Sequence, residues 1–480
     1  MEEIKSHEDV DKLNEERSAE DDGCLCSFFP KRYIVACLAM FGFFNAYALR
    51  VNLSVAMVAM VNNDTKFGHG LDIEKVAEFD WNSQLQALIL GSFFFGYITT
   101  QIPGGFFASK YGGKNLFGGG IFLASALTLL TPVAARCAVS YLIILRILQG
   151  VAQGVICSSN HAVMSQWAPL LERSTMIAFT LSGSYIGTVF TVPVSGILIK
   201  FYDWPVVFYF FGILGVLWSF FWFLNVTNSP REYAKISKRE LDYIEKSLEG
   251  QRDAKNSTNV PWKSILSSKA VWAIVAAHFC QNWGYYTLLT TLPTYMKSAL
   301  HIDLLTTGFL SSLPYITMAA VLYLSGLISD YFLKRRIFSI TYVRKFNVCT
   351  GFIFQAIFTA SVGYTRNQHT AVLLLALGGG MGGLIWSGFG VNMLDIAPMY
   401  SGLLMGISNC VATLPGMIAP LLAGVLTPNE TVQEWQIVFY ISAIISLFGC
   451  FIFAILASGV KQEWHEQYTV LPTSPNKLND

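Results

Sequence analysis

The stretch Ile144-Leu-Arg-Ile-Leu-Gln-Gly-Val-Ala-Gln-Gly-Val155 places a full positive charge, Arg146, inside a long apolar run. An arginine at the middle of a bilayer costs about 2.5–3.5 kcal/mol on insertion scales, and it is tolerated where it faces a protein interior or a water-filled cavity. The residues that share its face at helical spacing are Gln149, Gly150, Gln153 and Gly154. The stretch therefore predicts a membrane helix with a cationic, amide-rich face. That face is either an anion site on a polar pathway or a structural arginine satisfied by carbonyl groups of a neighbouring helix.

The composition is that of a polytopic membrane protein. Of 480 residues, 53% are hydrophobic and 13% are charged, whereas average proteins carry about 25% charged residues. The net charge of +1 gives no indication of nucleic-acid binding. The cysteines show no zinc-ligand spacing, and no metal cluster or nucleophile–base pair stands out. We therefore expect neither an enzyme nor a cofactor. Residues 1–23 are polar and mostly acidic, so we do not expect a signal peptide.

Apolar segments long enough to cross a bilayer recur along the chain. We place them at 33–61, 84–107, 115–133, 138–165, 172–199, 204–225, 269–298, 304–331, 340–364, 369–395, 401–426 and 433–457. The pattern predicts an all-α polytopic membrane protein with twelve transmembrane helices in two pseudo-symmetric six-helix halves. The predicted domains are a cytoplasmic tail at 1–32, a first half at 33–225, a cytoplasmic linker at 226–268, a second half at 269–457 and a cytoplasmic tail at 458–480.

Basic residues set the expected orientation, because they gather in cytoplasmic loops. They are dense in the loops on the side of the N-terminus and the linker, so both termini are expected to be cytoplasmic. The outer loop 62–83 then carries an N-glycosylation sequon at Asn63, while the same pattern at Asn256 faces the cytoplasm and should stay unmodified. In the C-terminal tail, Tyr468-Thr-Val-Leu471 is similar to tyrosine-based endolysosomal sorting signals.

The two halves also repeat a loop pattern. Gly105-x3-Ser109-Lys110 follows the second predicted span, and Gly326-x3-Asp330 with Arg335 and Arg336 follows the eighth. Two such halves are the architecture in which a central site is exposed to each face of the membrane in turn.

With these features the chain resembles the major facilitator superfamily. Arg146-x-x-Gln149-Gly150 matches its fourth-span motif, and the two repeated loops match its signature loops. The resemblance narrows to the anion and phosphate transporter family that contains sialin, the vesicular glutamate transporters and the type I sodium–phosphate cotransporters, with the sialin branch most similar. The matching stretches begin at Tyr47, Gly91, Gln101, Trp167, Phe309 and Asn392.

This resemblance implies secondary active transport of small anions by alternating access, sialin-like, with acidic sugars, acidic amino acids or related organic anions as substrates. It implies a lysosomal or vesicular membrane, a monomer, the lipid bilayer as surroundings, and H⁺ or Na⁺ as coupling ion. A sodium-dependent phosphate or urate-type organic anion cotransporter at the plasma membrane is the alternative. A non-transporting receptor or scaffold is the alternative of another class. Retention of two costly arginines favours transport, because a scaffold would gain by losing them.

The second of these arginines is Arg50, which lies deep in the first predicted span. Two guanidinium groups that converge on a cavity match a carboxylate or phosphate in bidentate geometry. The expected substrate-binding residues are Arg50, Arg146, Gln149 and Gln153, with Tyr97, Tyr286 and Asn392 added by the resemblance.

Acidic groups for coupling are less evident. Sialin carries glutamates where this chain has Gln149 and Gln153, and a glutamine does not exchange a proton near neutral pH. Asp395 and His278 are the remaining candidates for gating or coupling. A structural ion pair is favoured for Asp395, and a structural hydrogen bond for His278.

Overall fold

The computed structural model describes residues 30–61, 64–68, 71–75, 78–248, 260–298, 310–365, 367–429 and 431–466. Its long helices coincide with the predicted spans. In the first part of the chain they are α2 (Lys31–Val61), α3 (Ser83–Tyr111), α4 (Lys114–Leu129) with α5 (Thr131–Cys137), α6 (Val139–Gln153) with α7 (Ile156–Trp167), α8 (Arg173–Phe201) and α9 (Trp204–Asn225). In the second part they are α12 (Lys269–Ser298), α14 (Leu313–Lys334), α15 (Ile340–Val362), α16 (Gln368–Ile396), α17 (Ser401–Leu426) and α18 (Val432–Leu456).

Within these described ranges, nine helical segments are long and apolar enough to cross a membrane, and the bent pair α4 and α5 makes a tenth. The long helices α12 and α15 complete the set of twelve. The expected twelve-helix, all-α membrane fold is therefore confirmed.

Two of the predicted spans are not continuous helices. The third bends by 45° between α4 and α5, where Pro132 cannot donate a backbone hydrogen bond to the preceding turn. The fourth is interrupted after Gln153, beside two glycines that lie against α3. A Cβ on Gly150 would lie 2.0 Å from the Phe93 carbonyl oxygen, and one on Gly154 would lie 2.2 Å from Thr100 Oγ1. Close approach of two backbones therefore requires glycine here.

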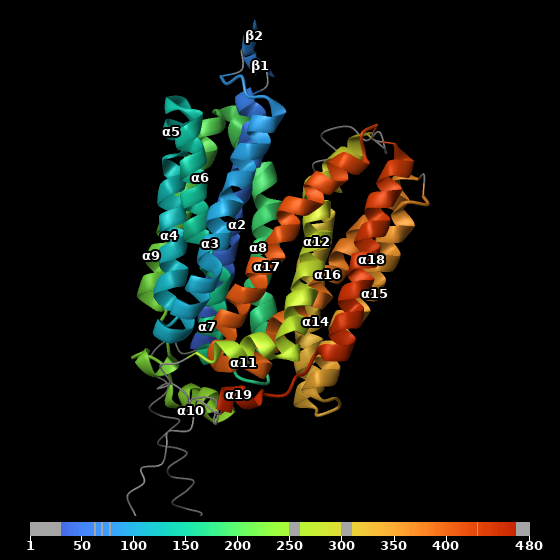
Figure 1. Cartoon of the computed structure of the whole chain (residues 1–480). Coiled ribbons are helices and arrows are strands. Elements are labelled where there is room, and N and C mark those ends of the chain that lie inside the picture. The colour runs from blue at the N-terminus through green and yellow to red at the C-terminus, as the bar shows by residue number, and fades with distance from the viewer. Residues whose placement is uncertain are drawn as a thin grey trace, which may run out of the picture.

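The sequence did not predict the one hairpin in the described chain. Strands β1 (Asp64–Gly68) and β2 (Leu71–Lys75) pair antiparallel, with Asp64 opposite Lys75. The hairpin projects from one end of the helical bundle, at the top of Figure 1. We call this the hairpin end.

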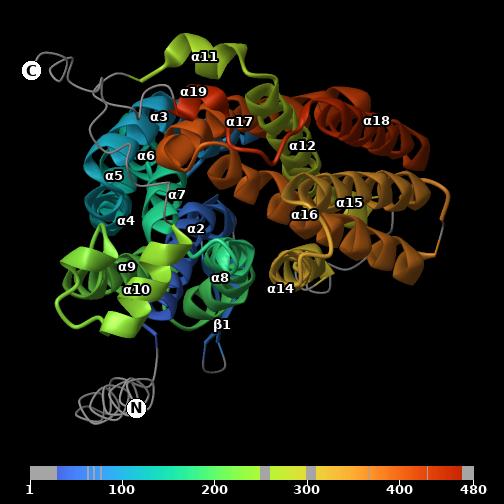
Figure 2. The ribbon, with the colours of Figure 1, turned by 90° about the horizontal axis from the view of Figure 1, so that it is seen from below.

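Short helices gather at the opposite end, which we call the linker end (Figure 1). They are α10 (Lys238–Ser247), α11 (Trp262–Ser267) and α19 (Glu463–Glu466). Figure 2 views the bundle from this end and shows the first six long helices grouped beside the last six. The two groups meet where α3 packs on α17 and α8 packs on α14.

Hydrogen bonds join the two groups at the linker end, beside a buried ion pair within the second group. Arg344 Nε lies 2.7 Å from Asp395 Oδ2, and Arg344 Nη1 donates to Ser174 Oγ at 3.0 Å. The carboxylate of Asp330 accepts from the backbone N–H groups of Ser174 and Thr175 at 3.1 and 2.7 Å. These bonds connect α14, α15 and α16 to the start of α8. The structure is therefore closed at the linker end, while the two groups diverge toward the hairpin end (Figure 1).

Helix α10 is bound to the same region by a second polar cluster. Arg32, at the start of α2, pairs with Glu172 at 2.8 Å and with Glu240 of α10 at 3.2 Å. Tyr243 of α10 donates to Glu172 at 3.1 Å. Burial and the neighbouring Glu172 carboxylate raise the pKa of Tyr243 to about 12, so the phenol keeps its proton and remains a donor. Glu172 directly precedes α8, so this cluster fixes the linker helix beside the inter-half contacts.

Candidate functional site

Arg146 lies in the protein interior, on α6, in the first part of the span formed by α6 and α7. Its side chain is 3% exposed, and its Nη1 donates to Gln149 Oε1 at 2.8 Å. Gln149 in turn donates to the hydroxyl groups of Thr128 at 3.1 Å and Thr131 at 3.4 Å. The i,i+3 spacing on one helix face brings the arginine and the amide together, as the sequence predicts. The two threonines come from α4 and α5, so their part in the cluster could not be seen from the spacing.

Arg50 reaches the same region from α2. Its Nη2 donates to Gln153 Oε1 at 3.4 Å. Its guanidinium carbon lies 4.7 Å from the ring centroid of Tyr47 and 4.6 Å from that of Tyr97. The ring of Phe93 is 4.7 Å from Arg50 and 5.1 Å from Arg146, so both cations lie beside one phenylalanine. The two arginines that were singled out separately are therefore brought together, each with its own glutamine of α6.

Among the residues that the structure describes, these two cations have no acidic partner. In the part of the chain that the structure describes, no carboxylate lies within ion-pair distance of Arg50 or Arg146. The Nε atoms of both are buried without a hydrogen-bond partner. A buried charge without a counter-ion is strongly unfavourable, and ring and amide contacts compensate it only partly. An anion that enters beside Phe93 would supply both the missing charge and the missing acceptors.

A small cavity of about 30 Å³ lies beside this cluster, between the two halves. Its lining includes Tyr47, Tyr97, Asn282, Tyr285, Tyr286 and Asn409. It has room for water but not for an organic anion. The aromatic side chains must therefore move apart before a larger ligand can reach the arginines.

Tyr97 and Tyr286 both line this cavity, from opposite halves of the molecule. Tyr286 packs edge-on against Phe94 of α3, with 5.8 Å between ring centroids. The Tyr97 hydroxyl accepts from Asn409 Nδ2 at 3.0 Å, and the same amide donates to Gln101 Oε1 at 2.7 Å. Sequence analysis missed Asn409, because its partners are about 310 positions away along the chain.

Three of the predicted residues lie apart from the arginines. Asn392 is fully buried and donates to the Ser458 carbonyl oxygen at 2.9 Å, so it faces the segment after α18 instead of the small cavity. Asp395 forms the ion pair with Arg344 at the linker end. His278 is buried, with its Nδ1 3.1 Å from Ser408 Oγ and its ring against two aromatic side chains of α16. These positions suit structural roles, and neither gating nor coupling by Asp395 or His278 follows from them.

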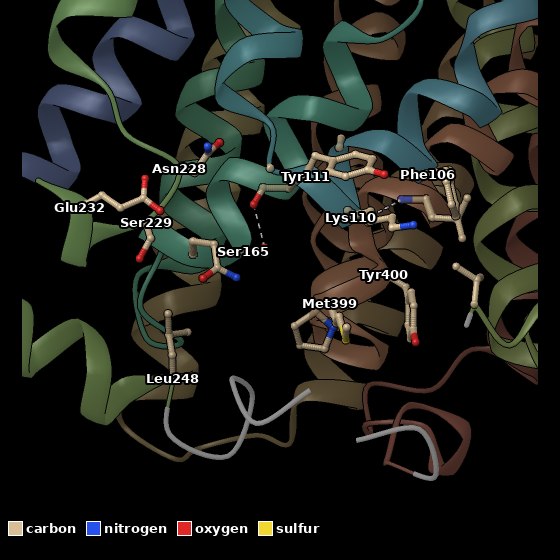
Figure 3. Close-up of a pocket in the computed structure, with 18 of the residues that line it drawn as sticks. Phe106, Lys110, Tyr111, Ser165, Asn228, Ser229, Glu232, Leu248, Met399 and Tyr400 are labelled. Atoms are coloured by element: carbon tan, nitrogen blue, oxygen red, sulfur yellow. Dashed lines mark hydrogen bonds between the residues drawn. The ribbon is translucent and has the colours of Figure 1, made fainter. Parts of the chain in front are cut away.

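A larger cavity of about 320 Å³ opens at the linker end, under α3 and α7 (Figure 3). Lys110 and Tyr111 line it from α3, Ser165 from α7, and Met399 and Tyr400 from the turn before α17. Neither Arg50 nor Arg146 lines it. Among the described residues, no three His, Cys, Asp or Glu side chains are grouped so as to hold a metal ion. Asn63, Tyr468 and Leu471 lie outside the described residues.

Comparison with known proteins places this arrangement in a family. Residues 33–364 match the model of the Major Facilitator Superfamily. Sialin from Homo sapiens is 45% identical, with 90% of each chain covered. Vesicular glutamate transporter 3 from Danio rerio is 42% identical, with 92% of this chain and 75% of the relative covered. A solved structure of a double tryptophan mutant of XylE superposes with a TM-score of 0.69 at 15% identity, over 91% of this chain and 98% of that one. The chain therefore belongs to the major facilitator superfamily, in the family that contains sialin and the vesicular glutamate transporters.

Proposed function

We propose that this protein is a secondary active transporter that carries small organic anions across a membrane by alternating access. The observation that carries the proposal is the pair of interior arginines, Arg50 and Arg146, which share the ring of Phe93 and each donate a hydrogen bond to a glutamine of α6. Such a pair matches a carboxylate, because a guanidinium group offers two parallel N–H donors to its two oxygens.

The surrounding rings indicate what kind of anion fits best. Tyr47, Tyr97 and Phe93 surround the Arg50 guanidinium, so part of the binding surface is apolar and part offers hydroxyl groups. An acidic sugar or an acidic amino acid has a carboxylate beside hydroxyl, amine or carbon groups, and fits such a surface. Glutamate, which appears in the names of the vesicular relatives, is one example. The relatives at 45% and 42% identity are a sialin and a vesicular glutamate transporter, so we place organic anions before phosphate.

The site lies between the middle of the bundle and the hairpin end, above the bonds that close the linker end. We infer that the hairpin end faces the lumen or the cell exterior, with both termini in the cytoplasm, because basic residues concentrate at the linker end. The proposed location is a lysosomal or vesicular membrane, and the proposed unit is a monomer. The coupling ion is H⁺ or Na⁺, or else transport is driven by voltage alone.

Uptake into proteoliposomes from a panel of labelled solutes tests the proposal. The panel contains an acidic sugar, L-glutamate, inorganic phosphate and an uncharged sugar of similar size. We expect uptake of at least one organic anion and no uptake of the uncharged sugar, and we expect Arg50→Ala to remove the anion uptake. Equal uptake of charged and uncharged sugars would contradict the anion site. Specific binding of an anion without uptake under any gradient would favour a receptor or scaffold.

A further inference from the structure

A third cavity, of about 430 Å³, lies at the linker end where the two halves approach each other. Leu170 and Leu171, from the turn between α7 and α8, line it from the first half. From the second half it is lined by Leu333 near the end of α14 and by residues 336–340, in the loop between α14 and α15 and at the start of α15. The buried ion pair of Arg344 and Asp395 completes the lining. We call this space the loop cavity.

The free charge around the loop cavity is positive. Lys334, Arg335 and Arg336 are consecutive and exposed, and Arg336 lines the cavity itself. No ion pair joins any of these three side chains to a carboxylate in the described part of the chain. The nearby acidic groups are already engaged: Asp395 is paired with Arg344, and Asp330 accepts two backbone N–H groups of α8. A ligand in the cavity therefore meets the Arg336 guanidinium, which has no carboxylate partner among the described residues, with Lys334 and Arg335 preceding it in the chain.

The rim of the same cavity is apolar. Leu170, Leu171, Ile337, Phe338 and Ile340 are between 36% and 50% exposed. They stand at the end of membrane-spanning helices, beside the exposed rings of Tyr342 and Phe346 on the outer surface of α15. A water-soluble anion would leave these side chains exposed, whereas a ligand with hydrocarbon chains would cover them.

The backbone conformation of Arg336 indicates that its side chain makes a favourable contact. Arg336 has a φ angle of 54°, and it is the one non-glycine residue with positive φ in the described chain. This left-handed region favours glycine, because a Cβ crowds the backbone there. An arginine in this position is disfavoured by its own backbone, so a contact made by its side chain is a physical reason to keep it.

We propose that the loop cavity binds an anionic phospholipid, with its phosphate on Arg336 and the neighbouring basic residues and its acyl chains along Leu170, Leu171, Ile337 and Phe338. Basic clusters next to a transmembrane helix attract anionic lipids of the cytoplasmic leaflet. The bound lipid spans both halves, because its two walls come from the α7–α8 turn and from the α14–α15 loop. The walls separate when the linker end opens, so the lipid binds the closed state more tightly and stabilises it.

Thermal unfolding of the full-length protein in mixed micelles tests this binding. Phosphatidylserine is titrated against phosphatidylcholine at constant total lipid. We expect phosphatidylserine to raise the melting temperature of the wild type in a saturable way. Loss of one basic contact near a membrane surface weakens binding about fivefold, so Arg336→Gly should shift half-saturation to about five times more phosphatidylserine. Arg336→Lys should keep most of the effect.

Two features of this design keep the result clear. Arg336→Gly removes the charge but relaxes the positive φ angle, so the variant should melt no lower than the wild type without anionic lipid. Arg239→Ala removes another exposed arginine, on α10, and should titrate like the wild type. An unchanged titration of Arg336→Gly, or an equal shift for Arg239→Ala, would overturn the proposed site.

A second set of measurements distinguishes a bound lipid from a bound soluble phosphate ester. Glycerophosphoserine has the same headgroup without acyl chains and should not stabilise the protein at matched concentration. Ile337→Ser changes an exposed apolar wall residue and should weaken phosphatidylserine binding without lowering the melting temperature in phosphatidylcholine alone. Equal stabilisation by glycerophosphoserine would show a site for soluble anions and would overturn the lipid assignment. The readout is binding, so it stands whether or not the proposed transport is observed.

Discussion

Arg146 and Gln149 lie one turn apart on α6 and share a hydrogen bond of 2.8 Å from Nη1 to Oε1. The partner of this buried cation is a neutral amide, which neither gives up nor takes a proton near neutral pH. Gln153 of α6 is likewise a neutral acceptor for Arg50, whose Nη2 donates to it from α2 at 3.4 Å. An incoming anion is therefore the counter-ion that the site lacks, and its charge crosses the membrane with it.

We expect Arg146→Ala to abolish anion uptake while the protein still reaches the membrane. Hydrogen bonds to charged groups contribute up to about 3 kcal/mol, so uptake should fall about 100-fold. Uptake and surface-exposed protein are measured in the same cells or vesicles, with Arg239→Ala on α10 as a control that should retain full uptake. Normal uptake by a normally delivered Arg146→Ala protein would show that this arginine is not part of the site.

Acids restored on α6 should make transport sensitive to pH. In the double variant Gln149→Glu with Gln153→Glu, each new carboxylate faces the arginine that the glutamine now contacts. Such a carboxylate competes with the substrate when ionised and admits it when protonated, so acidification should increase uptake. Uptake is measured from pH 5 to pH 8, with Gln84→Glu at the exposed start of α3 as a matched control. An active double variant with the flat pH profile of the wild type would show that these positions do not control coupling.

Removal of the Asn409 amide should loosen the closed linker end. Asn409→Ala leaves Tyr97 and Gln101 without this partner across the contact between the halves. An unsatisfied buried polar group costs about 1–3 kcal/mol, so the open state should be populated at least about fivefold more. The measurement is the labelling rate of a cysteine introduced at Ser158, which is fully buried near the α17 backbone.

Asn45→Ala is the matched control for that experiment, because Asn45 donates to Phe41 of its own helix and does not bridge the halves. Both variants are made in a background without native cysteines. If Asn409→Ala labels no faster than Asn45→Ala, the amide does not hold the linker end closed.

A glycan is expected on Asn63, because its sequon lies in the loop that carries the hairpin, on the proposed luminal side. Glycosidase treatment should shift the wild type on a gel and leave Asn63→Gln unshifted. Asn256→Gln, which removes the sequon in the linker, should behave like the wild type. An equal shift for the wild type and Asn63→Gln would exclude Asn63 as the acceptor.

The fold and part of the candidate site could be predicted from the local periodicity of the sequence. The apolar spans and the face shared by Arg146 and Gln149 depend on helical spacing within one segment, which a sequence displays directly. Contacts between segments could not be read in this way. The packing of α3, α4 and α17 determines three such contacts: Phe93 with both arginines, Thr128 with Gln149, and Asn409 with Tyr97 of the other half.

Asn392 is a different case. Its place in a family motif suggested substrate contact, and in this structure its amide donates to the Ser458 carbonyl, in the segment predicted to be the cytoplasmic tail. The hairpin of β1 and β2 was also missed. The first four residues of β2 alternate between apolar and polar, whereas those of β1 do not, so the pattern marks one strand without its partner.

The central claim is that the anion itself neutralises Arg50 and Arg146. Its most direct test is uptake into proteoliposomes in which ionophores clamp the pH gradient and the voltage separately. With no pH gradient, a vesicle interior held 100 mV positive should raise the equilibrium accumulation of a monovalent anion about 50-fold. A pH gradient at zero voltage should drive little uptake. Accumulation driven fully by a proton gradient at zero voltage would contradict the claim and would require a proton-binding group elsewhere, with Asp395 or His278 the next positions to test.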